Sequence, residues 1–234
     1  MSGRRVSVVI PTLNEAACIG SLLERLWGMP QIREVVVADG GSTDGTPELV
    51  RPPARLVRSE PGRGIQLNAG ARVTSGEVLF FLHADVVPPR DAALRMLEAI
   101  ENGAVGGNFR LSYPGGGVLG WWLEIVAAIY RGFGRYYGDS GIFVRRDVYE
   151  RLGGFPEIPI MEDLVFARRM EAAGKTACLP GPMISSPRRW RGRPLRTLLL
   201  WGFMQTAFAF GVSPWCLARL YNVQNVRRNG EEGR

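Results

Sequence analysis

The chain has 234 residues, of which 46% are hydrophobic and 22% charged, so it can bury an ordinary globular core and is not intrinsically disordered. Its 30 glycines and 16 prolines follow no period, which excludes collagen-like and low-complexity classes and predicts many turns. The net charge is +7, and every basic residue except Lys175 is arginine. Guanidinium groups favour phosphate-bearing partners, and nucleotides, nucleic acids and anionic lipids all meet that description.

Short β-branched runs alternate with helical patterns in the first half of the chain. Strands are predicted at 6–10, 34–38, 55–57 and 78–82, and helices over 19–26, from 65 onward and over 91–100 with Asp91 as its N-cap. Nearly all-apolar strands separated by helices predict a mainly parallel sheet that is covered on both faces. In such sheets ligands bind at the carboxyl ends of the strands.

The second half has a less regular pattern. It predicts a loop at 113–117, an apolar aromatic helix at 118–133, a strand at 141–144 and a helix at 160–173 that ends at Gly174. Trp121 and Trp122 could stack on a sugar or a lipid, but an apolar helical run predicts that they belong to the core. Glu162 and Asp163 lie in the first turn of the last helix, where acidic side chains suit the helix dipole, so capping alone would account for them.

The composition changes at Pro187. Five arginines crowd around Trp190, and an uncharged stretch from 197 to 218 follows, interrupted by Ser213-Pro214. Its first helix, about 16 to 18 residues long, is short against the roughly 20 residues of a membrane span. Because it is apolar on every side, it should be buried against protein, against a second copy of the chain, in a membrane interface or in a span. We divide the chain into a domain at 1–186 and a basic segment with apolar helices at 187–234.

Two polar loops follow the first two predicted strands. The loop at 11–15 contains Asn14 and Glu15, which could simply cap the next helix. The loop at 39–46 begins with Asp39, whose carboxylate can accept from a base N–H or a ribose hydroxyl, and continues with two glycines that let a ligand approach the backbone.

Two further loops carry an arginine and a carboxylate. The segment 61–70 lacks both the GxxxxGK[ST] and the GxGxxG spacing, but it places Arg63 between glycines at a helix start, where it could contact a diphosphate. The apolar strand at 80–82 leads into His83, Ala84 and Asp85. Magnesium and manganese bind few carboxylates together with water and substrate phosphates, and Asp85 can serve that purpose.

The order of these loops, together with Met161-Glu162-Asp163, resembles the family 2 glycosyltransferases over roughly residues 4–180. The resemblance implies an α/β GT-A fold, Rossmann-like with a mainly parallel central sheet flanked by helices, here with a C-terminal helical extension. It implies that Asp163 is the catalytic base, with Glu162 as its competitor, and that Asp85, the last Asp of the family's DxD motif, binds magnesium or manganese. The implied nucleotide-binding residues are Pro11, Thr12, Leu13, Asn14, Glu15, Asp39, Gly40, Gly41, Arg63, Asn68, His83 and Ala84.

Three positions depart from the family pattern. His83 replaces the first Asp of DxD, Ile65 stands where an arginine is common, and no later histidine is present as a metal ligand. We therefore expect modest metal affinity. The sequence resembles most a small bacterial subgroup with HAD in place of DxD, an Arg-Arg-Trp segment and a C-terminal apolar helix.

The resemblance implies an inverting single displacement on a nucleoside-diphosphate sugar. Asp139, Arg189 and Trp190 are predicted on the acceptor side or in a lid, although a simple turn and a solvated basic linker would also explain them. The apolar helix beside its arginines suggests a lipid-linked acceptor and peripheral contact with the inner face of the cell membrane. A homodimer is another predicted partner, and nucleic acid is not expected.

The three scattered cysteines, with His83 as the sole histidine, predict neither a disulfide scaffold nor a structural zinc site. No signal-like stretch precedes the first strand, so we expect cytoplasmic, reduced thiols. Two other functions stay open. A sugar-phosphate nucleotidyltransferase would also use Asp85 and a metal, but a GxGTR-like signature is missing. A non-catalytic basic module that binds RNA or membranes would explain the charge but not the four loops.

Overall fold

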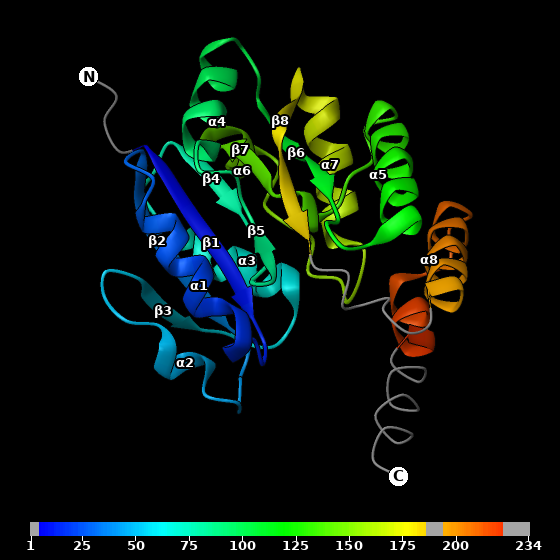
Figure 1. Ribbon diagram of the computed structural model, residues 1–234, viewed down its shortest axis with the longest axis horizontal. Helices are drawn as coiled ribbons and strands as arrows, with labels where there is room; N and C mark the ends of the chain where they lie inside the picture. The colour runs from blue at the N-terminus through cyan, green and yellow to red at the C-terminus, as the bar shows by residue number, and fades with distance from the viewer. Residues whose placement is uncertain (1–4, 186–193, 222–234) are drawn as a thin grey trace.

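The computed structural model describes residues 5–185 and 194–221, which form a mixed α/β fold around one eight-stranded sheet (Figure 1). The strand order is β3-β2-β1-β4-β7-β6-β8-β5. The strands are β1 (Val6–Thr12), β2 (Ile32–Asp39), β3 (Arg55–Arg58), β4 (Val78–Phe81), β5 (Val86–Val87), β6 (Gly106–Ser112), β7 (Ile142–Arg145) and β8 (Thr176–Ser185). The helices are α1 (Ala16–Trp27), α2 (Thr46–Leu49), α3 (Arg63–Arg72), α4 (Ala92–Glu101), α5 (Gly117–Gly132), α6 (Arg146–Arg151), α7 (Glu162–Ala173) and α8 (Pro194–Ala209), with a 3-10 turn at Gly138–Ser140 and a further helical segment at 214–221.

The first half of the sheet confirms the predicted parallel strands. β1 pairs in parallel with β2 and β4, and β2 pairs in parallel with β3. Side chains alternate between the two faces, so Val8 and Phe80 lie in one apolar cluster while Val9 and Phe81 lie in the other. All four side chains are buried. Burial on both faces is the reason that these strands read as continuous apolar runs.

The second half of the sheet is mixed, which the sequence pattern did not reveal. β7 runs antiparallel to β4 and β6, whereas β6 and β8 are parallel, and short β5 closes the edge antiparallel to β8. We predicted only the strand at 141–144. β6 and β8 escaped prediction because glycines and prolines interrupt their apolar pattern. Gly107 serves close strand packing, since a Cβ there would overlap the backbone of Ala177 on β8.

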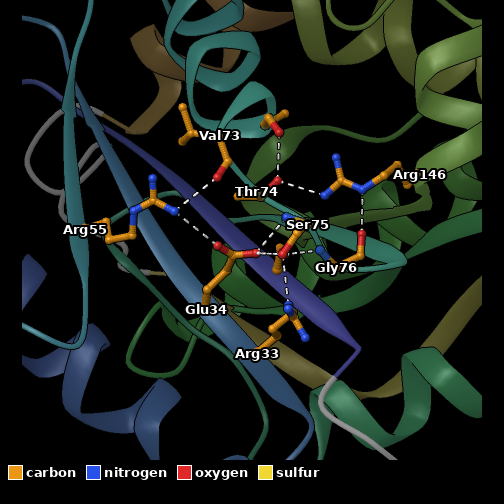
Figure 2. Close-up of polar contacts among 10 residues, drawn as sticks. Arg33, Glu34, Arg55, Val73, Thr74, Ser75, Gly76 and Arg146 are labelled. Carbon is orange, nitrogen blue, oxygen red and sulfur yellow. Dashed lines mark hydrogen bonds and ion pairs between the residues drawn. The ribbon is translucent and has the colours of Figure 1, made fainter.

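A polar cluster fixes the sheet at the amino ends of the parallel strands (Figure 2). The Glu34 carboxylate accepts hydrogen bonds from the Ser7 hydroxyl at 2.8 Å and the Ser75 backbone N–H at 2.7 Å, and it lies 3.4 Å from Arg55. Burial would raise the pKa of Glu34, but these donors hold it below its ordinary value. Nearby, Arg146 donates to the carbonyl of Gly76 at 2.6 Å. The cluster therefore holds β1, β2 and the turn before β4 in register.

The helix at α5 corrects one prediction. Trp121 and Trp122, expected in the core, are 62% and 49% exposed. Asp91 precedes α4 as predicted, but its carboxylate pairs with Arg95 at 2.6 Å and makes no capping bond. Along the ranges 5–185 and 194–221, no helix combines the length and apolarity needed to cross a membrane.

Candidate functional site

The loops after β1 and β2 meet at the carboxyl edge of the sheet. Asp39 accepts hydrogen bonds from the Thr12 hydroxyl at 3.1 Å, the Gly41 N–H at 3.0 Å and the Ser42 N–H at 2.9 Å. Burial would raise the pKa of Asp39, but these hydrogen bonds hold it below its ordinary value. Thr12 and Asp39 are both buried, whereas Leu13 is half exposed. Asp39 thus shapes the loop, and the exposed surface that this loop offers a ligand lies around Leu13.

The two loops also interlock through Asn14, whose φ of 58° lies in the left-handed region. Its side-chain oxygen accepts from the Thr43 N–H at 2.8 Å. The capping considered for Asn14 and Glu15 is performed by the second loop instead, because Asp44 accepts from the Ala16 N–H at 2.9 Å and Thr46 accepts from the Glu15 N–H at 2.9 Å. The loop at 11–15 is therefore held in place by residues of the loop at 39–46 and not by side-chain caps of α1.

Gln66 is a site-building residue that the sequence reasoning missed. From α3 its amide donates to the carbonyls of Thr12 at 2.7 Å and Ala38 at 2.9 Å, and its side chain is buried. A Cβ on Gly40 would lie 3.1 Å from the Gln66 amide. Buried polar side chains are nearly always hydrogen-bonded. A glutamine on the buried face of the predicted helix was therefore the sequence signal that could have identified Gln66 as a residue that shapes the site.

Asn68, predicted in the nucleotide site, joins α3 to another segment. Its amide donates to the Phe155 carbonyl at 2.9 Å and accepts from the Phe155 N–H at 2.9 Å and the Tyr149 hydroxyl at 2.7 Å. These bonds use both ends of the amide. Asn68 therefore positions α3 and, through it, Arg63.

Arg63 and Glu162 form an ion pair of 3.0 Å between the first residues of α3 and α7. The Arg63 side chain is 41% exposed, whereas Glu162 is 1% exposed. Burial, joined by the charge of neighbouring Asp163, raises the pKa of Glu162 to about 7 against the opposing effect of Arg63. Behind Arg63, a Cβ on Gly64 would overlap the Pro156 carbonyl, so a glycine is required for this close packing.

Asp163 is turned differently from its neighbour. Its Oδ2 accepts from the Gly138 N–H at 2.8 Å and its Oδ1 from the Leu164 N–H at 2.7 Å. α7 begins at Glu162, two residues later than predicted, after Met161 with a left-handed φ of 66°. This sharp entry brings both acidic side chains inward, where Asp163 is 5% exposed.

A cavity of about 1030 Å³ collects the chemically active side chains. Of the predicted site residues, Arg63, His83, Asp85, Asp139 and Asp163 line it. Its other walls come from β6, α5 and α8 and from residues near Tyr221. The predicted residues Ala84 and Glu162 are buried behind the surface, and Arg189 and Trp190 lie outside the described residues.

Asp139 and Asp85 come to the cavity wall from two different segments of the chain. Asp139 belongs to the 3-10 turn before β7, and the Tyr113 hydroxyl donates to its Oδ2 at 3.3 Å. Asp85 follows β4. The described part of the chain contains no group of three or more His, Cys, Asp or Glu side chains arranged to hold a metal. One carboxylate at a cavity suits a magnesium or manganese ion that takes its remaining ligands from phosphates and water.

Cations beyond the predicted set also line the cavity. Arg110 on β6, Arg135 after α5 and Lys175 before β8 border it. No motif marked these residues, because their elements were not predicted or lie far apart in the sequence. Together with Arg63 and Arg131 they offer an anionic ligand five cationic groups, in a wall that also carries the five carboxylates Asp85, Glu124, Asp139, Asp163 and Glu171.

The comparisons with known proteins agree with this architecture. The profile of Glycosyl transferase family 2 matches residues 7–152. Glycosyltransferase AglE of Haloferax volcanii is 31% identical over 196 residues, which cover 72% of this chain and 62% of AglE. The chain thus spans about three fifths of the length of that relative. These matches agree with the family resemblance found in the sequence, and they do not point to the nucleotidyltransferase or the basic binding module that were also considered.

The chain is also similar to a solved mannosyltransferase structure and to an undecaprenyl-phosphate sugar transferase. A mannosyltransferase from Pyrobaculum calidifontis, solved in complex with GDP-Man and Mn²⁺, has a TM-score of 0.66 and 24% identity, covering 92% of this chain and 68% of its own. This likeness confirms the GT-A fold. The undecaprenyl-phosphate 4-deoxy-4-formamido-L-arabinose transferase of Aeromonas hydrophila is 33% identical over 111 residues, 42% of this chain and 34% of that protein.

Proposed function

Because the chain belongs to glycosyl transferase family 2, we propose that it is an inverting, metal-assisted glycosyltransferase that moves a sugar from a nucleoside-diphosphate sugar to an acceptor hydroxyl. The observation that carries the proposal is the cavity itself, in which Arg63 from the start of α3, Asp85 from the turn after β4 and Asp163 from the start of α7 border one space. We also propose that it belongs to a small bacterial subgroup, and its HAD sequence, Arg-Arg-Trp segment and apolar helix support this assignment. Residues 1–186 form the transferase domain in this proposal.

The donor lies along the carboxyl edge of the sheet. The interlocked loops contact the nucleoside through Pro11, Thr12, Leu13, Asn14, Glu15, Asp39, Gly40 and Gly41. The half-exposed guanidinium of Arg63 faces the cavity and binds the diphosphate. Asp85, beside His83, would hold a magnesium or manganese ion together with that diphosphate. The bound ion would supply positive charge that stabilises the leaving group.

The reaction is a single displacement. The acceptor oxygen attacks the anomeric carbon, the bond from that carbon to the diphosphate oxygen breaks, and its electron pair departs with the nucleoside diphosphate. The hydroxyl proton passes to the Asp163 carboxylate. Glu162 is the weaker candidate for this base, because it is buried and paired with Arg63 while Asp163 lines the cavity.

The acceptor is amphiphilic in this proposal and carries a lipid anchor. The apolar surfaces of α5 and α8 beside the cavity support this assignment, as does the name of the Aeromonas hydrophila relative, a transferase acting on undecaprenyl phosphate. We place the protein at the inner face of the cell membrane as a peripheral protein.

Thermal unfolding with UDP, GDP, CDP or dTDP, each with and without Mn²⁺, tests the donor site. At a ligand concentration about 100 times the dissociation constant, linkage gives roughly 2.7 kcal/mol and raises Tm by on the order of 5 to 10 °C. We expect one nucleotide to give this shift only with Mn²⁺ and the Asp85→Ala variant to lose it. Asp91→Ala, which removes a carboxylate at the start of α4, should keep it. Absence of a shift with every nucleotide would refute the donor site.

A further inference from the structure

The helix α5 exposes its apolar face and turns its charged side chains toward the protein. Its large apolar side chains recur at intervals of three and four residues, which places them on one face of a helix. That face is turned to the outside. The exposed members are Val118 (82%), Trp121 (62%), Trp122 (49%), Ile125 (38%) and Ile129 (53%), with Phe133 (75%) directly after the helix.

The charged side chains of α5 point into the protein and hold this orientation. Glu124 accepts from the Ser112 hydroxyl at 2.9 Å and the Tyr113 N–H at 2.7 Å. About two helical turns later, Arg131 donates to Asn108 on β6 and forms an ion pair of 2.9 Å with Glu171 on α7. Rotating α5 to bury its apolar face would break both sets of contacts, so the exposure is built into the fold.

The guanidinium of Arg131 makes two more contacts that strengthen this anchor. It donates to the Thr176 hydroxyl at 2.8 Å and lies 4.5 Å from the ring centroid of Tyr136. The side chain of Arg131 is only 13% exposed. An arginine with these partners is costly to move, because its charge would be left buried and unpaired.

The second half of the surface comes from α8 and residues 214–221. These segments lie on the same side of the molecule as α5 (Figure 1), and both helices line the cavity. Met204 is buried, whereas the opposite face of α8 is exposed. The exposed apolar residues are Leu199 (75%), Phe203 (56%), Phe210 (86%), Val212 (39%), Trp215 (56%) and Leu220 (48%). We call the exposed apolar residues of α5, Phe133 and this second set the apolar surface.

Two exposed arginines flank the apolar surface in the part of the chain that the structure describes. The sequence from the end of β8 into the first turn of α8 is also rich in arginine, with residues at 188, 189, 191, 193 and 196. The single acidic residue of α5, Glu124, is turned inward. Exposed Arg135 follows α5 and exposed Arg219 lies within the second helical segment. An anionic partner would neutralise this arrangement.

We propose that the apolar surface docks on an anionic lipid bilayer, with α5 and α8 lying in the interface and the arginines contacting lipid headgroups. Helices rich in Trp, Phe and Leu with flanking arginines bind membranes in this way without crossing them. A symmetric contact between two copies would instead place Arg135 and Arg219 of both copies at one interface, and these like charges repel each other. The role of this docking rests on the proposed function. Because the docked surface borders the cavity, an acceptor anchored in the bilayer would reach Asp163 from the membrane side.

Vesicle co-sedimentation of the full chain, without donor or metal, tests the docking. The vesicles are phosphatidylcholine with and without phosphatidylglycerol. We expect the wild type to bind the anionic vesicles and the Trp122→Glu/Ile129→Glu variant to bind them about tenfold or more weakly, since it loses two apolar contacts. Neither residue lines the cavity. The matched control Leu49→Glu/Leu94→Glu alters residues 43% and 40% exposed on α2 and α4 and should bind as the wild type does.

The other outcomes overturn the proposal. A wild type that stays in the supernatant with anionic vesicles has no such docking surface. A Trp122→Glu/Ile129→Glu variant that binds like the wild type assigns binding to the arginines alone. Analytical ultracentrifugation in which this variant is monomeric and the wild type is a vesicle-free dimer would assign the surface to a second copy. Asp163→Asn should bind vesicles unchanged, so a failure of the proposed chemistry leaves this test intact.

Discussion

The backbone N–H of Gly138 donates a 2.8 Å hydrogen bond to Oδ2 of Asp163, joining the 3-10 turn before β7 to the first turn of α7. On its other side Gly138 faces His83, because a Cβ there would lie 2.5 Å from the His83 Nε2. Three segments that are distant in the sequence therefore meet at one glycine. In the proposed mechanism this contact aims the catalytic base.

Gly138→Ala should impair catalysis more than folding. The added methyl group would displace the turn or the His83 ring, and the Asp163 carboxylate would lose its aim; positioning errors of about 1 Å cost on the order of 100-fold in rate. Steady-state kinetics should show a lower kcat with a smaller change in the donor KM. Gly20→Ala is the control, since a Cβ at that helical position meets nothing within 4 Å. Equal turnover in both variants would contradict the positioning role.

Asp163→Asn should abolish transfer and spare donor binding. The amide keeps nearly the same shape but cannot accept the hydroxyl proton, and loss of a general base costs about 10² to 10⁴ in rate. Turnover with the natural acceptor measures the first effect, and the nucleotide-dependent rise in Tm measures the second. Near-full turnover would show that the attacking group has no proton to lose, as with a phosphate oxygen.

Glu162 should make stability fall as pH rises. Its pKa is about 7 in the folded chain against an ordinary 4.5, so it is neutral in both states at low pH and resists ionisation when folded. Its stabilising contribution is complete below pH 4.5 and is lost as pH rises through 7. Relative to the wild type, Glu162→Gln should gain on the order of 1 to 3 kcal/mol between these limits. Urea unfolding at several pH values measures the difference, and parallel curves would refute it.

Glu34→Ala should destabilise the fold without touching the site. The change leaves the buried Ser7 hydroxyl without its carboxylate acceptor, which costs about 1 to 3 kcal/mol, whereas the exposed Ser75 N–H can bond to water instead. Urea unfolding checks this loss, with exposed Glu48→Ala as a control expected to be within about 0.5 kcal/mol of the wild type. The nucleotide-dependent Tm shift should persist, because Glu34 lies at the opposite edge of the sheet. Its disappearance would link that edge to the site.

The sequence alone predicted the parallel half of the sheet and the loops at its carboxyl edge. Strands buried on both faces are continuously apolar, and the residues that end them are consecutive in the chain, so local pattern and motif order were sufficient. Arg63, Asp85 and Asp163 were singled out in this way, and all three line the cavity. The family resemblance followed from the same motifs, and the profile match to residues 7–152 confirms it.

Only the tertiary structure decided which way side chains face. The apolar helical pattern predicted that Trp122 would be buried. The inward contacts of Glu124 and Arg131 instead orient α5 so that Trp122 faces the solvent. Likewise Asn68 and Gln66 lie two residues apart on α3, yet one braces Phe155 and the other the ends of β1 and β2. A helical pattern identifies an apolar face, but the polar contacts made with distant segments determine whether that face meets the core or the solvent, and those contacts do not exist before the chain folds.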